Sequence, residues 1–306
     1  MKLYAGFDSG GSKTACFLCD EEGNLLGSGL GGSSNYLFCG KTAAAEAVKE
    51  SLFTAFAAAE IEAQPLACAF VGSAAILLGH GAQHLPFFRD CVPARQVFCD
   101  SDILPVWFGG AAGGDAVAAI AGTGSIAYGC TAEGFFRVGG WGPLLGDEGS
   151  GYDLGRRALQ TAARMADGRA PLDPAFLERL LRFYDVKTAH DLIFAVNGKD
   201  YRRKIAACAK VVFELENSPT AHRLLEETAE ELALLCRTAA QGAGREDLPV
   251  ILTGGLAESI LPRLWTRLSQ VSLLPVPPGL ACAALALEKD GRSAAALRLL
   301  REGCLC

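Results

Sequence analysis

The order of predicted helices and strands constrains the fold of this chain more than any other sequence feature. Residues 3–28 are predicted to form three consecutive strands, and single strands then alternate with helices to about residue 112. A second three-strand segment is predicted at 115–138, and the alternation returns at 250–288 after a long helical stretch. The order β-β-β-α-β-α-β-α therefore occurs twice, although the letters do not repeat. We expect an α/β protein with two similar domains and a cleft between them.

The repeat also predicts the domain boundaries. We expect an N-terminal domain at 1–112 and a C-terminal domain at 113–289, the latter enlarged by a helical insert at about 152–242. The basic amphipathic segment 290–306 is predicted to form a helix that packs back on the N-terminal domain. A chain of 306 residues is long enough for two cores of this size.

Composition and charge narrow the classes of function. Hydrophobic residues make up 50% of the chain and charged residues 20%, which favours packed cores over disorder. The net charge of −6 argues against a broad nucleic-acid-binding surface. No apolar stretch is long and pure enough to span a bilayer, and Met1–Gly6 leads into a predicted strand without a signal peptide. We therefore expect a cytoplasmic protein with no nucleic-acid or membrane partner.

Twelve cysteines are scattered along the chain, mostly within apolar segments. Cys16 and Cys19 have the C-x2-C spacing of some metal sites, but no second such pair follows at zinc-finger distance. In a cytosolic protein we expect these cysteines to be reduced and buried, where they act as small hydrophobic side chains. A metal or iron–sulfur site is the alternative.

A glycine-rich loop, residues 8–14, follows the first predicted strand. Gly10, Gly11 and Ser12 at its centre would allow backbone N–H groups and a hydroxyl to cradle phosphate oxygens. Asp8, at the end of the strand, is a candidate to hold a hydrated Mg²⁺ ion through water. An ordinary glycine-rich hairpin is the alternative.

A second loop of this kind ends the first strand of the second repeat. Thr123 is its candidate hydroxyl donor to a terminal phosphate, and Gly122 and Gly124 on either side let the backbone approach a ligand. Neither loop matches the G-x-x-x-x-G-K-[ST] pattern or a G-x-G-x-x-G turn in a β-turn-α context. Two matching loops in two halves predict a triphosphate site of a different type, with ATP as the ligand.

A third glycine-rich segment, residues 139–151, surrounds one tryptophan and two adjacent carboxylates. Ordering such a segment costs backbone entropy, so we expect a ligand or a strong contact to compensate. The ring of Trp141 suits the apolar face of a sugar, and the Asp147 carboxylate can accept hydrogen bonds from two neighbouring hydroxyls. The alternative is a core tryptophan with a helix N-cap formed by Asp147 and Ser150, and both interpretations can hold at once.

Together these segments resemble the BadF/BadG/BcrA/BcrD ATPase family of the actin-like ATPase superfamily, and within it the N-acetylglucosamine kinase branch. The resemblance rests on residues 8–14, on 122–125 and on 140–150, where Gly-Trp-Gly is followed by Gly-Asp-Glu-Gly-Ser. Residues 250–255, Val-Ile-Leu-Thr-Gly-Gly, are similar to the adenosine-loop motif of the superfamily. The match runs in order from residue 3 to about residue 288. It implies duplicated ribonuclease H-like domains that use ATP and Mg²⁺.

The resemblance also implies roles for individual residues. Ser12 and Thr123 match residues that lie on the ATP phosphates, and the adenosine would lie at Gly254, Gly255 and Glu258. The residues that match the sugar site come from two segments of the chain: Asn35, Gly140, Trp141, Gly142 and Asp147.

The catalytic base of the resembled kinases is an aspartate that follows the last strand of the first domain. Asp102 aligns with it, and Ser101 stands where the family usually has asparagine. Asp100, two residues earlier, is a competing candidate, and a surface aspartate that caps a helix is the alternative to any catalytic role.

The resemblance implies an ATP-dependent hexosamine kinase that phosphorylates the primary hydroxyl of a small amino sugar. N-acetylglucosamine is the first candidate, ahead of N-acetylmuramic acid and glucosamine. The rival within the family is an ATPase that activates a dehydratase or reductase through an iron–sulfur cluster. That branch differs from this chain at residues 141–150, and Cys130 is the only cysteine near this segment. A non-catalytic sugar-sensing regulator is a third interpretation. A homodimer through the helical insert is a further expectation.

Overall fold

The structure is a computed structural model in which residues 1–304 are described. The chain forms two compact units. Unit 1 contains residues 1–114 and the chain from Leu274 onward, and unit 2 contains Asp115–Leu273. The last two residues of the predicted helix 290–306, and with them Cys306, lie outside the described part. The two units are best understood one at a time, because each has its own sheet and its own core.

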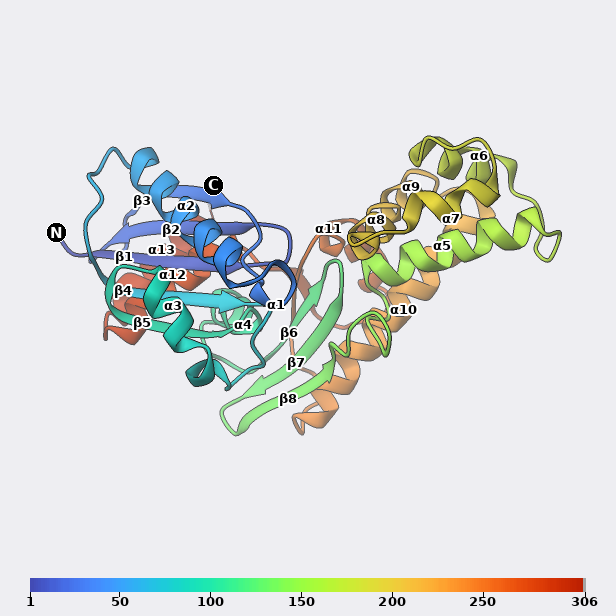
Figure 1. Cartoon of the computed structure of the whole chain (residues 1–306). Coiled ribbons are helices and arrows are strands. Elements are labelled where there is room, and N and C mark those ends of the chain that lie inside the picture. The colour runs from blue at the N-terminus through green and yellow to red at the C-terminus, as the bar shows by residue number, and fades with distance from the viewer. Residues whose placement is uncertain (305–306) are drawn as a thin grey trace. The chain divides into compact units, whose positions relative to one another are not determined.

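Unit 1 is built on a five-stranded sheet with helices on both faces (Figure 1). Its strands are β1 (Leu3–Ser9), β2 (Thr14–Asp20), β3 (Leu25–Gly31), β4 (Leu66–Ser73) and β5 (Ala94–Ser101). Its helices are α1 (Tyr36–Cys39), α2 (Lys41–Ala58), α3 (Leu85–Cys91), α4 (Ile103–Ala111), α12 (Pro278–Lys289) and α13 (Ser293–Gly303), with a 3₁₀ turn at Gly81–Gln83.

The strand order in unit 1 is β3-β2-β1-β4-β5. β1, β2 and β3 form an antiparallel meander, whereas β1, β4 and β5 run parallel. Parallel strands place their carboxyl ends at the same edge of a sheet, which is where ligands of open α/β sheets bind. The ends of β1, β4 and β5 therefore define the edge at which functional side chains of unit 1 gather.

Alternate residues of β1 supply the two cores of unit 1. Leu3 and Phe7 are buried on one face with α2 and α3, and Tyr4 is buried on the other face with α12 and α13. This alternation follows from the period of two in a strand. Burial on both faces explains why β1 is a nearly continuous apolar run.

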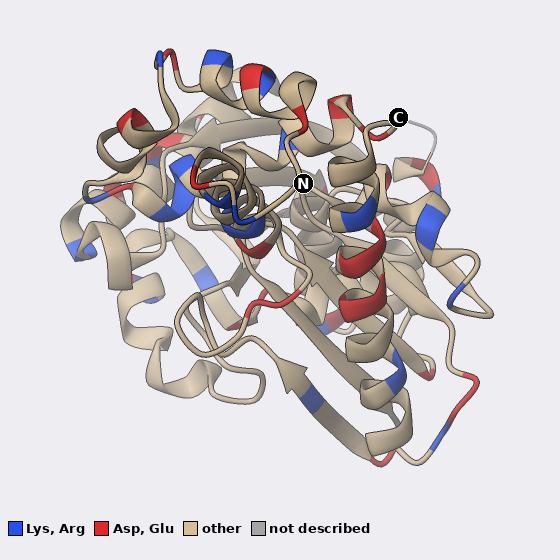
Figure 2. Ribbon diagram, turned by 90° about the vertical axis from the view of Figure 1, so that its right-hand side faces the viewer, with Lys and Arg blue, Asp and Glu red and all other residues tan. Residues whose placement is uncertain are grey.

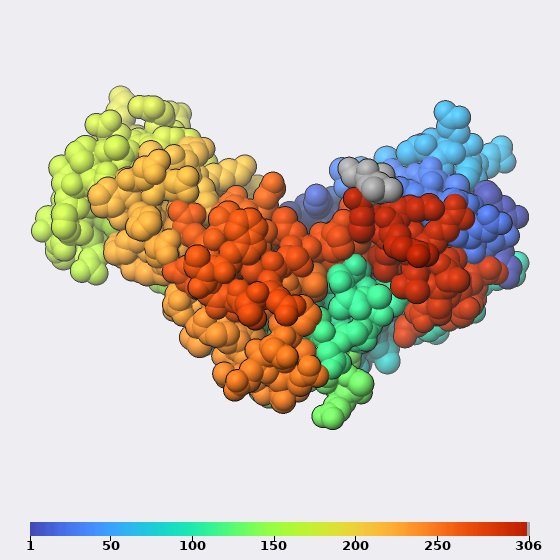
Figure 3. Space-filling view, turned by 180° about the vertical axis from the view of Figure 1, so that it is seen from behind, coloured from blue at the N-terminus to red at the C-terminus, as the bar shows by residue number. Residues whose placement is uncertain are grey.

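The C-terminal helices lie beside the first strands of the chain (Figure 3). The predicted boundary after residue 289 is therefore corrected, because α12 belongs to unit 1. The reason is a close approach: a Cβ atom on Gly6 would lie 1.9 Å from the backbone nitrogen of Ala283. Only glycine allows β1 and α12 to pack at this distance. Sequence periodicity does not show which sheet a helix covers.

Unit 2 has a second five-stranded sheet and more helices. Its strands are β6 (Ala116–Ala121), β7 (Ser125–Thr131), β8 (Gly134–Gly139), β9 (Val250–Thr253) and β10 (Val271–Leu273). Its helices are α5 (Gly151–Ala166), α6 (Pro174–Phe183), α7 (Leu192–Val196), α8 (Tyr201–Ala207), α9 (Ala209–Glu214), α10 (Pro219–Gly242) and α11 (Ala257–Leu264), with a 3₁₀ turn at Ala189–Asp191.

The strand order in unit 2 is β10-β9-β6-β7-β8. Read from the other edge, β8-β7-β6-β9-β10, it repeats the order of unit 1 strand for strand. β6 is antiparallel to β7 and parallel to β9, as β1 is to β2 and β4. The predicted duplication is therefore a duplication of topology.

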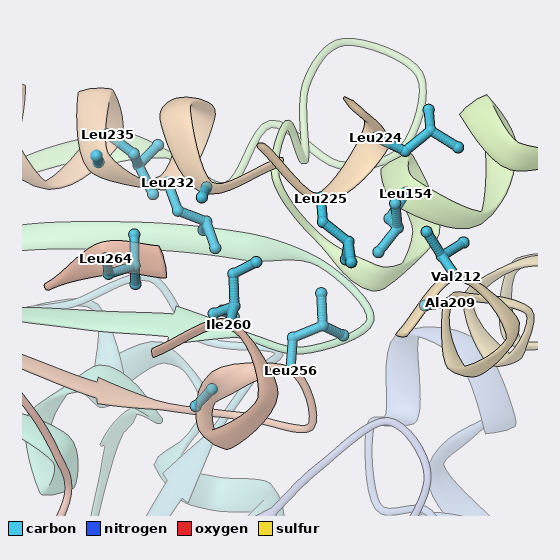
Figure 4. Packing of buried hydrophobic residues seen from close by; sticks show 14 of the residues in the cluster. Leu154, Ala209, Val212, Leu224, Leu225, Leu232, Leu235, Leu256, Ile260 and Leu264 are labelled. Atoms are coloured by element: carbon cyan, nitrogen blue, oxygen red, sulfur yellow. The ribbon is translucent and has the colours of Figure 1, made fainter. Parts of the chain in front are cut away.

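The core of unit 2 is one large cluster of aliphatic side chains. Figure 4 shows Leu232 and Leu235 of α10 facing Ile260 and Leu264 of α11. The α10 helix begins at an N-cap in which the Ser218 side chain accepts a hydrogen bond from the Ala221 backbone N–H. Unit 2 thus holds its helical insert and its sheet in the same core.

Charged residues of both signs are interspersed along the ribbon in the view of Figure 2. On α10, for example, Glu226 pairs with Arg263 and Arg267 of the neighbouring α11 region. Such an arrangement gives the surface no broad field of one sign. Within residues 1–304, none of the helices combines the length and the apolar character that crossing a membrane requires.

Candidate functional site

The carboxyl edge of the unit 1 sheet carries a row of polar residues. The register of β1, β4 and β5 places Ser9, Ser73 and Ser101 next to one another. Asp8 lies one residue before this row and Asp102 one residue after it, at the N-cap of α4. The topology therefore brings together side chains that are about 90 residues apart in the sequence.

Asp8 and Asp102 influence each other electrostatically. Burial raises the pKa of Asp102 to about 6, and the negative charge of Asp8 adds to this effect. Burial also raises the pKa of Asp8 to about 6, while the positive charge of Lys13 acts in the opposite direction. A divalent cation beside Asp8 would relieve the repulsion, so this edge fits the predicted Mg²⁺ site.

Asp100, the competing candidate for the base, is engaged by the backbone. Its Oδ1 atom accepts hydrogen bonds from the Gly79 N–H at 2.9 Å and from the Ser101 N–H at 2.7 Å. These bonds hold the loop after β4 against the end of β5. The Asp102 carboxylate has a single side-chain partner in this region, the Ser101 hydroxyl at 3.3 Å. It also accepts hydrogen bonds from the backbone N–H groups of Asp102 and Ile103, so both aspartates are bonded to the backbone, and they differ in that Asp100 alone of the two is bonded to the Gly79 loop.

The predicted phosphate loop of unit 1 is a tight turn between β1 and β2. The Gly10 N–H donates to the Lys13 carbonyl at 3.1 Å, which closes the turn. Gly11 and Ser12 at its tip are exposed. Their N–H and hydroxyl groups are thus available to an anion, and their ATP role stays a prediction.

Asn35 lies in the segment between β3 and α1, which is bonded to this turn. The Ser34 N–H donates to the Gly10 carbonyl at 3.3 Å. The Asn35 side-chain oxygen accepts from the Leu37 N–H at 3.2 Å and caps the short helix α1. Asn35 is only 3% exposed, so its orientation is set by the fold. Its predicted contact with a sugar is not tested by this geometry.

The matching turn of unit 2, between β6 and β7, is pinned at several points. The Gly122 carbonyl accepts from the Gly151 N–H at 2.8 Å, and the Thr123 carbonyl accepts from the Tyr152 N–H at 3.2 Å. These bonds join the turn to the start of α5. The Thr123 residue itself is exposed at the tip. A phosphate at Thr123 would therefore meet the positive end of the α5 dipole.

Asp147 is buried beside this turn and carries an ion pair. Its carboxylate lies 2.8 Å from Nη2 of Arg202 and accepts a hydrogen bond from the Ser125 backbone. Burial raises the pKa of Asp147, and the charge of Arg202 opposes the rise. Asp147 has a positive φ of 63°, an uncommon conformation for a residue with a side chain. Asp147 therefore fastens the β6–β7 turn, and its predicted contact with a sugar remains a prediction.

Trp141 is not a core residue, because 64% of it is exposed. The Arg137 guanidinium lies 4.9 Å from the centre of its ring, and Arg137 Nη2 donates to the Gly140 carbonyl at 2.7 Å. The Trp141 ring therefore contacts Arg137 but remains open to solvent.

The rest of this glycine-rich segment leads to α5. Gly142 precedes two exposed leucines, Leu144 and Leu145. At the end of the segment, Ser150 caps α5 by accepting from the Asp153 N–H.

A pocket of about 500 Å³ opens beside the β6–β7 turn within unit 2. Gly122 and Thr123 line it together with Gly255 and Ser259, so it joins the predicted phosphate turn to the predicted adenosine loop. Its volume lies in the range of pockets that bind small ligands. Gly124, Gly254 and Glu258 are outside the set of lining residues.

Gly254 does not line the pocket but allows the ends of β9 and β6 beside it to pack closely. Its φ is 108°, and a Cβ atom there would lie 2.4 Å from the Ala121 carbonyl oxygen. The Leu256 N–H donates to the same carbonyl at 2.9 Å. These contacts join the end of β9 to the end of β6. The glycine is therefore required by the close approach of two strands.

A model of the BadF/BadG/BcrA/BcrD ATPase family matches residues 5–268 of the chain. The chain belongs to this family. The match includes the carboxyl edge of unit 1, the pinned turn of unit 2 and the pocket, so the family assignment covers every feature described above.

The curated relatives of this BadF/BadG/BcrA/BcrD-family chain include three amino-sugar kinases. An N-acetylmuramic acid/N-acetylglucosamine kinase of Clostridium acetobutylicum is 27% identical over 271 residues, which is 85% of this chain and 87% of the relative. A glucosamine kinase of Vibrio cholerae is 25% identical over the same shares of both chains. An N-acetyl-D-glucosamine kinase of Dictyostelium discoideum is 33% identical over 150 residues, 46% of this chain and 47% of the relative.

Solved structures resemble this family member over almost its full length. A proposed N-acetylglucosamine kinase from Chromobacterium violaceum has a TM-score of 0.79 at 25% identity and covers 98% of this chain and 99% of its own. A ROK-family glucokinase from Streptomyces griseus, in complex with glucose and AMPPNP, has a TM-score of 0.57 at 17% identity, with 94% and 99% coverage. The second likeness shows the fold alone. Both agree with the actin-like ATPase and sugar kinase fold.

Several residues of the site were missed by sequence reasoning. The pocket is also lined by Arg203 of α8 and by Lys210 and Phe213 of α9. These residues are far along the chain from any glycine-rich loop. Arg202, the partner of Asp147, comes from the same helical segment. No motif marks these positions, because helical basic residues usually lie in solvent. The insert of this family member therefore contributes to the site as well as to the core.

The cysteines of this family member are mostly buried. Eleven described cysteines have no disulfide, and Cys130 in particular is fully buried within β7. Burial raises the pKa of the Cys130 thiol to about 12. Within residues 1–304, no three or more His, Cys, Asp and Glu side chains are grouped so that they could hold a metal ion.

Proposed function

We propose that this protein is an ATP-dependent amino-sugar kinase that phosphorylates the primary hydroxyl of N-acetylglucosamine. Asp102 carries the proposal, because its carboxylate is buried beside Asp8 with a raised pKa and is bonded to its neighbours in the chain, whereas Asp100 is bonded to the Gly79 backbone of another loop. The amino-sugar kinases among the relatives support the choice of substrate.

The residues of unit 1 would act on the sugar hydroxyl. Asp102 orients the hydroxyl and takes its proton as the new bond to phosphorus forms. A base with a pKa of about 6 is still ionised at neutral pH and is a stronger proton acceptor than an ordinary aspartate. Asp8 would hold Mg²⁺ through water, and the ion when bound neutralises charge on the phosphates. Asn35 would bind a hydroxyl or the amide of the sugar.

The residues of unit 2 would bind the nucleotide. The backbone N–H groups at Gly122 and the Thr123 hydroxyl would bind phosphate oxygens, in keeping with the exposed, pinned turn at the start of α5. The adenosine would occupy the pocket lined by Gly255 and Ser259.

Two residues of unit 2 would bind the sugar. Trp141 offers an exposed ring face to the apolar side of a sugar, and the Asp147 carboxylate would accept hydrogen bonds from its hydroxyl groups.

A kinase assay over a panel of sugars tests this proposal. ADP release is measured with N-acetylglucosamine, glucosamine, N-acetylmuramic acid and glucose, each at several concentrations. We expect the highest kcat/KM with N-acetylglucosamine and a much lower value with glucose. Phosphorus NMR of the product should show coupling to the protons on carbon 6. ADP release that no amino sugar stimulates would refute the proposal.

Iron content distinguishes this proposal from the rival within the family. Protein purified without oxygen should be colourless and free of iron, because Cys130 is fully buried within β7 and no three metal-ligating side chains of residues 1–304 are grouped together. A brown preparation with stoichiometric iron and sulfide would instead favour an activator that carries an iron–sulfur cluster.

A further inference from the structure

Four buried hydroxyl groups form a continuous chain in unit 1. Thr14 Oγ1 lies 2.6 Å from Ser34 Oγ, and Ser34 Oγ lies 2.7 Å from Ser9 Oγ. Ser9 Oγ lies 3.3 Å from Ser73 Oγ. At the other end, the Thr14 hydroxyl donates to the Gly32 carbonyl at 2.8 Å. All four side chains have 0% exposure, so bulk solvent does not reach the chain.

Such a chain is not needed for packing. Buried hydroxyls cost free energy unless each is hydrogen-bonded, and alanine or valine would fill the same space without that cost. Each hydroxyl has one proton to donate, so loss of one member leaves its neighbour in the chain with one partner fewer, although the Gly32 carbonyl and the Ala75 N–H remain as partners at the two ends. The strands that carry Ser9, Thr14 and Ser73, and the loop that carries Ser34, are therefore held in one arrangement.

Every serine of the chain is next to a residue of the proposed site. Ser9 follows Asp8, and Ser34 precedes Asn35. The Ser73 carbonyl accepts a hydrogen bond from the Asp102 N–H at 3.3 Å. The chain thus connects the predicted metal, sugar and base positions through short buried hydrogen bonds within unit 1.

We propose that Ser9, Thr14, Ser34 and Ser73 are positioning residues that hold Asp8, Asn35 and Asp102 in register with one another. The inference rests on the proposed function, because it concerns how that reaction is aligned. None of the four hydroxyls touches the substrate. They act through the segments that they join, so their loss displaces three groups at once and affects the chemical step more than the binding of either substrate.

Thr14 offers a matched pair of variants for the test. Thr14→Val keeps the shape of the side chain and removes the hydroxyl, whereas Thr14→Ser keeps the hydroxyl and removes a methyl group. We expect Thr14→Val to lower kcat about tenfold, the effect of one lost hydrogen bond with an unsatisfied partner. ADP affinity should change less than kcat does, because the pocket beside the predicted adenosine loop is in unit 2 and the Thr14 hydroxyl lies beneath the predicted phosphate loop of unit 1. Thr14→Ser should restore most of kcat.

Ser51→Ala is the control for a buried hydroxyl outside the chain. Ser51 has 0% exposure, and its hydroxyl donates to the Val48 carbonyl at 2.8 Å within α2. This variant should lose some stability and keep kcat. If Thr14→Val retains the wild-type kcat, or if Thr14→Val and Thr14→Ser are equally impaired, the positioning role is wrong. Should Thr14→Val fail to fold, Ser73→Ala at the end of the chain carries the same comparison.

A double variant and a measurement without substrate complete the test. Once the chain is broken, Thr14→Val with Ser34→Ala should lower kcat little further than Thr14→Val does. Amide hydrogen exchange should speed up in residues 32–36 and 101–103 of Thr14→Val but not of Ser51→Ala. The exchange result stands even if no amino sugar is phosphorylated, so failure of the proposed function and failure of this inference are distinguishable. Unchanged exchange in both segments would overturn the inference.

Discussion

Units 1 and 2 share one strand order but equip the same edge of the sheet differently. In unit 1 the strand ends carry Asp8 and Asp102, whose pKa values are both raised to about 6, and a chain of buried hydroxyls lies beneath them. In unit 2 the corresponding turn is nearly free of side-chain charge at its tip and is pinned by the Asp147–Arg202 ion pair. The comparison teaches that a duplicated topology supplies two similar edges, and that the residues at the strand ends decide the chemistry of each.

The largest effect should come from the base in unit 1. Asp102→Asn keeps the shape of the side chain and removes the proton acceptor, so kcat should fall about 10³-fold while sugar affinity, measured by calorimetry, is retained. Asp100→Asn is the matched control at the same edge. It should lower stability through the Gly79 and Ser101 hydrogen bonds but retain much of kcat. The opposite ranking of the two variants would assign the base to Asp100.

The ion pair in unit 2 should matter mainly for structure. Asp147→Ala removes the buried carboxylate and its hydrogen bond to Arg202 and should cost about 2 kcal/mol of the free energy of unfolding. The nucleotide KM should also rise, because the Ser125 backbone loses an acceptor at the β6–β7 turn. Thermal unfolding with and without ADP measures both effects. A variant that unfolds like the wild type but no longer binds the sugar would show that Asp147 serves the ligand and not the turn.

The two glycines after β9 sharpen the comparison further. Gly254→Ala requires a positive φ and a Cβ atom 2.4 Å from the Ala121 carbonyl, so we expect a loss of about 2 kcal/mol in the free energy of unfolding. Gly255→Ala meets nothing within 4 Å and should fold normally. Because Gly255 lines the pocket, its variant should raise the nucleotide KM a few-fold instead. Denaturant titration and ADP calorimetry separate the two outcomes.

The smallest effect concerns the pH dependence of stability in unit 1. The folded-state pKa of Asp102 is about 6, above that of an unfolded aspartate, so its burial lowers stability at neutral and higher pH. This penalty should disappear as the pH falls through about 6 toward 4, where the carboxyl group is protonated. Asp102→Asn should therefore be more stable than the wild type at pH 8, by about 1 kcal/mol after allowing for partial exposure.

The same linkage predicts the acid limb of the activity profile. Because the base must be ionised, kcat of the wild type should decline below a pH of about 6. A stability difference between Asp102→Asn and the wild type that stays constant from pH 4 to pH 8 would contradict the raised pKa.

Local sequence patterns predicted the elements that depend on neighbours in the chain. The helix expected after the three opening strands is α2, and the strands around both glycine-rich loops are β1, β2, β6 and β7. The loops were recognisable because a chain reversal between two buried strands needs glycine and small polar residues. The placement of α12 was not recognisable, since its apolar face fits either sheet equally well by sequence.

The residues of the candidate site also divide into those that local sequence patterns marked and those that only the fold brought together. Gly122 and Thr123 were expected in a ligand-binding turn and line a pocket, whereas Lys210 and Phe213 line it from a helix with no distinguishing motif. Thr14 and Ser34 were likewise unremarked in the sequence, although they hold the middle of the hydroxyl chain. Partners that are distant in the sequence and joined through one hydrogen bond leave no periodic signal.

The sequence by itself determined that the chain has two α/β repeats, where their glycine-rich turns lie and which family the motifs resemble. Those features depend on strand alternation and on residues within a few positions of one another. Only the tertiary structure decided that Asp100 is bonded to the Gly79 backbone of a distant loop whereas Asp102 is bonded to its neighbours Ser101 and Ile103, that Asp147 pairs with Arg202, and that four hydroxyls connect the edge of unit 1. These depend on burial and on long-range contacts, which raise a pKa or satisfy a polar group only once the strands have come together.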